Sequence, residues 1–129
     1  MSPLGQLERF SPHAFLALRI VSGLLFATHG AQKLFGVLGG TVASLTTQLG
    51  LGGVIELCTG LLIALGIATR PAAFLASGTM AVAYIQFHWR GQLGSAFWPV
   101  VNKGELAVIY CFLFLYIACS GPRIGRAGR

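Results

Sequence analysis

The fold of this chain is decided first by residues 14–35, which read AFLALRIVSGLLFATHGAQKLF. As a helix this stretch is long enough to cross a membrane, because about 20 mainly apolar residues span the roughly 30 Å of hydrocarbon. Ser11 and Pro12 precede it and suit a helix start, as a capping residue and a first-turn proline. The stretch is longer than a signal-peptide core and is interrupted by Arg19. We therefore expect a retained transmembrane helix.

Three further apolar stretches predict the same kind of helix. They cover about residues 49–69, 71–88 and 105–120, and the last stops at Gly121-Pro122. Of the 129 residues, 55% are hydrophobic and only 9% are charged, whereas a soluble domain is about one quarter charged. The chain lacks the charge for a water-facing surface. We expect an all-α protein, a single domain of four transmembrane helices in an antiparallel bundle, with the lipid bilayer as its solvent.

The basic residues predict an orientation in the membrane. The net charge is +6, but Lys and Arg stand singly between apolar runs and form no basic stripe, so a nucleic-acid partner is not expected. The side of the two termini carries five basic residues, Arg9, Arg70, Arg123, Arg126 and Arg129. The opposite side carries three, Lys33, Arg90 and Lys103. Because basic residues concentrate in cytoplasmic segments, we expect both termini in the cytoplasm.

Polar residues inside the expected helices point to a site. Ionisable groups are costly at bilayer depth and usually face a helix interface, a cavity or a partner. On the first helix, one arc of about 120° holds the polar and small residues, namely Arg19, Ser22, Gly23, Phe26, His29, Gly30 and Lys33. On the second helix, Glu56 shares a face with small residues that permit close helix packing. On the fourth, Glu105 shares a face with Ile109, Phe112 and Tyr116.

The four-helix topology brings an ionisable residue from each helix, His29, Glu56, His88 and Glu105, into the outer half of the bundle. Together with Lys33 they form the candidate ligand or proton site. Supporting roles are expected for Arg19, Gln32, Tyr84 and Asn102. Phe26, Tyr84 and Phe112 are expected to supply apolar walls, and residues 89–98 a roof. An aromatic belt that merely anchors residues 89–103 at the membrane surface is an equal alternative.

Three interpretations of this cluster are considered: proton exchange, metal binding and a structural ion pair. His29 and Glu56 could exchange protons with a quinone, since histidine titrates near neutral pH. Imidazole and carboxylate could bind a metal, but no HxxxH or ExxH spacing occurs within a helix, so no metal site is predicted. Pairing of Glu56 with His29 or Lys33, holding two helices together, carries equal weight with a functional site. His88 is expected at the interface in contact with water.

Four polar residues near the helix ends have simpler interpretations. Arg19 is expected to extend its side chain to water as an orientation anchor, with an anionic head group as the alternative ligand. Arg70 is expected to anchor the inner surface within a tight turn at residues 69–71. Asn102 is a candidate cap for the fourth helix, and Glu105 would complement its positive end. Residues 36–50 form a Gly/Thr/Ser loop that could hold a short helix lying at the interface.

Several strings resemble the DoxX family of small membrane proteins. They are Arg19 with GLLF at 23–26, HGAQKLFG at 29–36, ELCTGLL at 56–62, LGIATRPAA at 65–73 and NKGELA at 102–107. The resemblance covers about residues 15–123 and implies a four-helix inner-membrane protein with cytoplasmic termini. The family's polar pattern falls on His29, Gln32, Lys33, Glu56, Arg70, Asn102 and Glu105. Thr59 stands where many members carry Gly.

The resemblance also implies a link to quinone-coupled chemistry. Members resemble subunits of thiosulfate:quinone oxidoreductase or of terminal quinol oxidases, and others resemble accessory subunits of redox-stress complexes or efflux pumps. We expect a redox-associated membrane subunit that is not catalytic alone, with a quinone as the candidate cofactor. The alternative is a non-catalytic scaffold, and either is expected to have a protein partner or to be a homo-oligomer. Cation export is disfavoured because the first helix carries Arg and His instead of a carboxylate.

Overall fold

The chain is helical along most of its length in a computed structural model, which describes residues 2–123. No strand occurs within that range. The α-helices are α1 (Ser11–Phe35), α2 (Gln48–Leu65), α3 (Thr69–Ala83), α4 (Pro99–Asn102) and α5 (Glu105–Ser120). Two 3-10 helices, η1 (Gly5–Phe10) and η3 (Gly94–Phe97), and one π-helix, η2 (Tyr84–Trp89), complete the set. Arg126 and Arg129, two of the basic residues used to orient the chain, lie outside the described residues.

Local backbone geometry explains where the helices begin and end. α2 stops at Leu65, earlier than the pattern predicts, because Gly66 adopts a left-handed φ of 74° and its N–H closes the last turn onto Ile63. The turn to the next helix therefore precedes Thr69, which already belongs to α3. α5 has the same bounds as expected.

Two expectations about the ends and loops are wrong. Ser11 caps no helix, because η1 runs directly into α1 and Phe10 occupies the cap position without a side-chain hydrogen bond. Residues 36–47 contain no helix, whereas the short helices η3 and α4 lie in the later loop, between η2 and α5. Glycines and a Ser–Thr turn fill the earlier loop instead, where the hydroxyl of Thr47 accepts from the N–H of Gly50 to cap α2.

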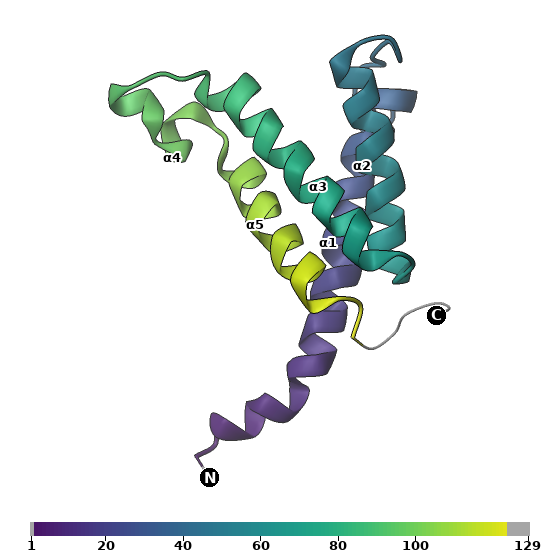
Figure 1. Cartoon of the computed structure of the whole chain (residues 1–129), viewed down its shortest axis with the longest axis vertical. Helices are drawn as coiled ribbons and strands as arrows, with labels where there is room; N and C mark the ends of the chain where they lie inside the picture. The colour runs from purple at the N-terminus through teal and green to yellow at the C-terminus, as the bar shows by residue number, and fades with distance from the viewer. Residues whose placement is uncertain (1, 124–129) are drawn as a thin grey trace.

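The long helices form two antiparallel pairs, α1 with α2 and α3 with α5 (Figure 1). The two pairs meet near the end of the molecule that holds the first and last described residues, and they diverge toward the opposite end (Figure 1). α2 and α3 join the pairs through the short turn after Leu65.

Glycine allows α1 and α2 to pack unusually closely. A Cβ atom placed on Gly23 would lie 2.6 Å from the carbonyl oxygen of Gly60, and one on Gly30 would lie 2.5 Å from that of Gly53. In each case the neighbour is backbone, which cannot move aside as a side chain can. The small residues that share a face on each helix in the sequence therefore form the contact surface of this pair.

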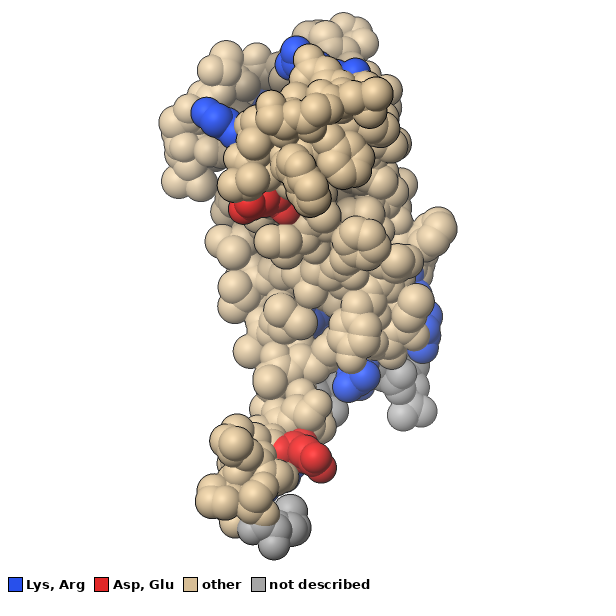
Figure 2. All heavy atoms as spheres, turned by 90° about the vertical axis from the view of Figure 1, so that its left-hand side faces the viewer, with Lys and Arg blue, Asp and Glu red and all other residues tan. Residues whose placement is uncertain are grey.

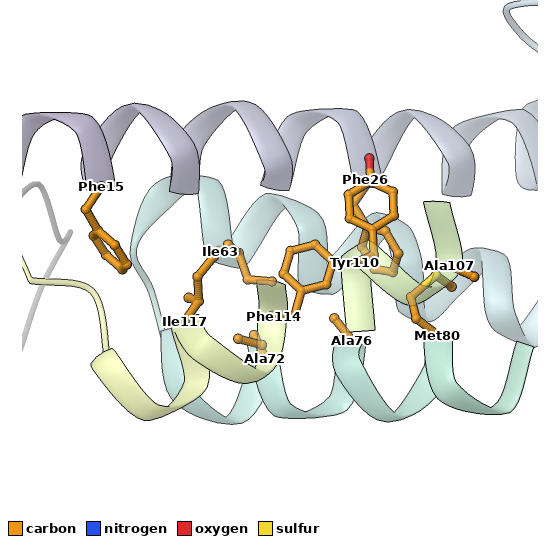
Figure 3. Close-up of a cluster of buried hydrophobic side chains, with 11 residues drawn as sticks. Phe15, Phe26, Ile63, Ala72, Ala76, Met80, Ala107, Tyr110, Phe114 and Ile117 are labelled. Atoms are coloured by element: carbon orange, nitrogen blue, oxygen red, sulfur yellow. The ribbon is translucent and has the colours of Figure 1, made fainter. Parts of the chain in front are cut away.

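A compact aromatic and aliphatic core joins the two pairs where they meet (Figure 3). The rings of Tyr110 and Phe114 on α5 stack with centroids 5.3 Å apart, and Phe26 of α1 packs against Phe114 at 4.8 Å. α5 buries the face formed by Ala107, Tyr110, Phe114 and Ile117. The face predicted to point inward is exposed, namely Glu105, Ile109, Phe112 and Tyr116. α5 is apolar on all sides, so its sequence contains no amphipathic pattern that distinguishes the two faces.

Apolar side chains dominate the outside of the molecule. On the face shown in Figure 2, most of the surface is uncharged, and small groups of Lys and Arg atoms show near the top and in the lower half, with one Asp or Glu patch below the upper group and another near the lower end. Two helical segments within residues 2–123 are long and apolar enough to cross a membrane, the 31-residue Gly5–Phe35 and the 18-residue Gln48–Leu65. Glu105–Ser120 is a shorter apolar helix. η2 continues α3 without a break as far as Trp89.

Candidate functional site

An ion pair links the first two long helices at the centre of the candidate site. The Lys33 ammonium on α1 donates to both carboxylate oxygens of Glu56 on α2, at 2.7 and 2.8 Å. Glu56 is 3% exposed, while the Lys33 side chain keeps 28% of its surface accessible. A Cβ on Gly53 would lie 2.9 Å from the Cβ of Lys33. The absence of a side chain at Gly53 therefore lets Lys33 cross α2 one turn before Glu56.

This ion pair borders a cavity of about 830 Å³ between the two helix pairs. From α1 and α2 the cavity is lined by His29, Lys33 and Glu56, and from the other pair by His88, Lys103 and Tyr110. The remaining lining is mainly apolar and consists of Phe26, Gln48, Leu49, Leu51, Gly52, Ile55, Phe74, Leu75, Gly78, Thr79, Met80, Val82, Ala83, Phe87, Leu106 and Ala107. An apolar cavity with a few converging polar groups is the usual form of a small-molecule site.

Tyr110 belongs to this site although the sequence interpretation omitted it. Its side chain is 6% exposed, and its ring meets that of His29 edge-on with centroids 6.3 Å apart. Figure 3 shows its hydroxyl oxygen extending toward α1. The position of Tyr110 within its helix could have identified it from the sequence. Tyrosine in a membrane helix normally lies near the ends, whereas Tyr110 is the sixth residue of a 16-residue helix.

Two of the predicted site residues, His88 and Glu105, do not lie with the ion pair as expected. His88 lines the cavity, but its Nδ1 lies 3.3 Å from the carbonyl oxygen of Asn102 and its ring stacks on Tyr84. Glu105 is exposed at the start of α5 and does not line the cavity. The five predicted residues are therefore not all gathered, because the first turn of α5 directs Glu105 away from the other pair.

The supporting residues Gln32, Tyr84 and Asn102 organise the two outer loops. Gln32 donates to the carbonyl oxygen of Leu38 at 3.0 Å. Asn102 donates to the hydroxyl oxygen of Tyr84 at 3.1 Å, and its own Oδ1 accepts from the N–H of Gly104 at 2.9 Å. Asn102 is thus not the cap of α5, because it ends α4 and holds the turn between the two helices.

Arg19 does not reach water as expected. It is fully buried, with 0% exposure, and backbone carbonyls accept hydrogen bonds from its guanidinium inside the protein. Its Nη1 donates to the carbonyl oxygen of Pro122 at 2.7 Å, and its Nη2 to that of Ala64 at 3.4 Å. These bonds tie α1 to the end of α2 and to the segment after α5, so Arg19 lies outside the cavity and stabilises the fold.

Arg70 also holds the end of α5. Its Nη1 donates to the carbonyl oxygens of Ala118 and Cys119, at 3.1 and 2.6 Å. The last carbonyls of a helix have no partner within the helix and carry partial negative charge, which favours a cation there. Arg70 is accordingly an exposed side chain with a structural contact to α5.

The aromatic loop does not roof the large cavity. Trp89, Phe97 and Trp98 line a second cavity of about 410 Å³, together with Tyr84 and Phe112. The expected walls Tyr84 and Phe112 therefore belong to this second cavity, and of the three predicted walls only Phe26 lines the first. Phe112 lines the second cavity and not the first because it lies on the outward face of α5.

The described residues contain no group of three or more His, Cys, Asp or Glu side chains that could hold a metal ion. A carboxylate, a lysine, imidazole rings and a phenol can bind a polar head group and can hold or exchange protons.

Together these features define a class: a protein that is all-helical over its described residues, with an apolar surface and with a partly buried ion pair beside a cavity between two helix pairs. The model of the DoxX family matches residues 14–89. A protein of Haemophilus influenzae, described only as uncharacterized, is 40% identical over 122 residues, covering 92% of this chain and 90% of that protein. The chain belongs to the DoxX family and is a membrane protein in contact with the lipid bilayer. No solved structure matches it.

Proposed function

We propose that the protein is an inner-membrane subunit of a redox-associated complex that binds a quinone or another redox-active small molecule. The observation that carries this proposal is the Lys33–Glu56 pair, which lies beside His29 and Tyr110 on the wall of the cavity. An isolated pair between two helices would need no cavity. Here the ionisable groups border a space large enough for a ligand.

The proposed topology has four spans with both termini in the cytoplasm. α1 and α2 have the length and hydropathy for it, and α3 together with η2 rises about 30 Å at 1.5 Å per residue. α5 is shorter, and it begins beside the exposed loop that contains Trp98. The described ends of the chain lie toward the same end of the molecule, as an even number of spans requires (Figure 1).

Proton exchange is the proposed role of the cavity wall. Glu56 and His29 would pass protons to or from the polar ring of the ligand, and Lys33 would orient the Glu56 carboxylate through its two hydrogen bonds. The side chains present supply no electron carrier of their own, so electrons would come from a bound ligand or from a partner protein. The protein would accordingly not be catalytic alone.

The test is native mass spectrometry of the protein released from membranes in mild detergent. We expect a reproducibly bound redox-active small molecule that is lost in Glu56→Gln and retained in Glu8→Gln. Glu8 is a matched control because it is an exposed carboxylate before α1, far along the chain from the cavity. A small molecule held equally by both variants would contradict the proposal.

A second candidate is a non-catalytic scaffold or accessory subunit of a membrane complex or efflux pump. It is favoured by the position of the ion pair between α1 and α2, where it also joins two helices, and by the exposed aromatic loop. In this case Glu56→Gln would lower thermal stability, and a second polypeptide or another copy of the chain would accompany the protein. A protein that is isolated alone, with unchanged stability in Glu56→Gln, would exclude it.

A further inference from the structure

The large cavity opens sideways between α2 and α3. Several of its lining side chains are also well exposed, among them Leu51 of α2 at 56% and Phe74 and Val82 of α3 at 68% and 47%. These residues are apolar and lie within membrane-facing helices. A ligand could therefore enter from the hydrocarbon of the bilayer without passing through water.

The dimensions of this opening fit a lipid chain. The lining residues of α3 and η2 run from Phe74 to His88, a distance of about 20 Å along the helix. One leaflet of hydrocarbon is about 15 Å deep, half of the roughly 30 Å of a bilayer. Gly78, in the middle of this run, has no atom within 4 Å of its Cβ position, so the groove is open at that depth.

The charged groups of the cavity favour a negative head group. Glu56 is the only carboxylate among the lining residues, and both of its oxygens already accept from Lys33. Lys103 also lines the cavity, and its ammonium has no hydrogen bond or ion pair with any described residue. The hydroxyl of Tyr110 likewise has no partner there. The cavity thus offers unused donors and an uncompensated cation, but no free carboxylate.

We infer that this cavity binds an anionic amphiphile drawn from the bilayer, with a carboxylate or phosphate head at Lys103 and Tyr110 and an apolar chain between α2 and α3. The inference concerns the same cavity as the proposed function but goes beyond it, since it assigns a lipid-derived anion to the cavity and not a redox-active molecule. A cationic head would meet Lys103 and the donors of the site. A neutral head would gain no ion pair with Lys103.

The inference can be tested by native mass spectrometry titrations in a non-ionic detergent with two matched pairs of probes. Palmitate is compared with hexadecanol, and phosphatidylglycerol with phosphatidylcholine. We expect at least one anionic probe to bind about tenfold more tightly than its partner, and this preference to disappear in Lys103→Gln, since a charged hydrogen bond contributes about that factor. Palmitate binding would identify a free fatty acid as the source, and phosphatidylglycerol binding a membrane phospholipid.

Two further variants separate head-group recognition from the chain groove. Arg90→Gln removes an exposed cation of the same outer side that does not line the cavity, and should leave the titrations unchanged. Gly78→Phe places a ring in the open groove and should abolish binding of the anionic probes while thermal unfolding shows an intact fold. Equal affinity for charged and uncharged probes, or an unchanged preference in Lys103→Gln, would overturn the inference.

A short-chain quinone, added as a fifth probe, distinguishes failure of the two proposals. Quinone binding without a preference for anionic probes would leave the proposed redox function standing and overturn the inference. A preference for anionic probes that depends on Lys103, with no quinone binding, would support the inference and contradict the redox function.

Discussion

Replacing Gly60 by alanine should force α1 and α2 apart. The added methyl group would lie 2.6 Å from the carbonyl oxygen of Gly23 and 2.7 Å from the backbone nitrogen of Ala27, whereas ordinary contact begins at 3.4 Å. The shortest contact is therefore 0.8 Å too close, and both neighbours are backbone atoms of α1. Overpacking of this kind costs about 1–3 kcal/mol, against a gain in helix propensity of about 0.5–1 kcal/mol.

The matched control is Gly52→Ala on the same helix. Its new methyl group meets nothing within 4 Å, so only the helix-propensity gain remains and the variant should be slightly more stable than the parent. The assay is thermal unfolding of the purified protein in one detergent, followed by circular dichroism. Gly60→Ala should melt below the parent and Gly52→Ala at or above it. Equal melting temperatures for the two variants would refute the close helix contact.

Three other substitutions test the contacts of Lys33, Arg19 and Asn102. Lys33→Met leaves Glu56 buried without its partner and should lower the free energy of unfolding by about 3 kcal/mol or more. Adding Glu56→Met should restore most of that loss. A double variant less stable than Lys33→Met would contradict this prediction. Arg19→Lys keeps the charge, but lysine cannot donate to two separated carbonyls as the guanidinium does. The free energy of unfolding should therefore fall by about 1–3 kcal/mol, seen as a lower melting temperature. An unchanged melting temperature would be inconsistent with these hydrogen bonds. Asn102→Ala removes the side-chain hydrogen bonds that hold the loop before α5, so tryptic cleavage of this loop should become faster. Gln92→Ala should not change the rate, because the Gln92 side chain makes no hydrogen bond with a described residue. Equal rates for the two variants would refute the role of Asn102.

Much of the site could be predicted because membrane helices place few polar groups at depth. The expected pairing of Glu56 with either His29 or Lys33 includes the contact that the structure shows with Lys33. The polar arc on the first helix also matches its buried face, including Ser22 and Gly30. Burying a polar or small residue against a neighbouring helix is the favourable arrangement in a bilayer, so this periodicity carries information.

Other parts of the site could not be predicted from the pattern. α5 is apolar on every side, so nothing in its sequence indicated that Tyr110 would point inward and Phe112 outward. Arg19 has a long side chain that could reach either water or buried carbonyls, and the choice depends on Pro122, more than 100 positions away in the chain. The prediction that residues 89–98 roof the large cavity is wrong because it also depended on the rotation of α5, which places Phe112 beside the second cavity.

Composition, apolar run lengths and local strings are properties of the chain alone, and they are enough to identify an all-helical membrane protein of the DoxX family. The tight packing of the first two helices is also a local property, since Gly23 and Gly60 leave no side chain between them. Which residues meet around the cavity depends instead on the tertiary structure. The divergence of the two helix pairs and the rotation of α5 depend on contacts between distant segments, above all the stacking of Phe26, Tyr110 and Phe114, and no local pattern encodes those contacts.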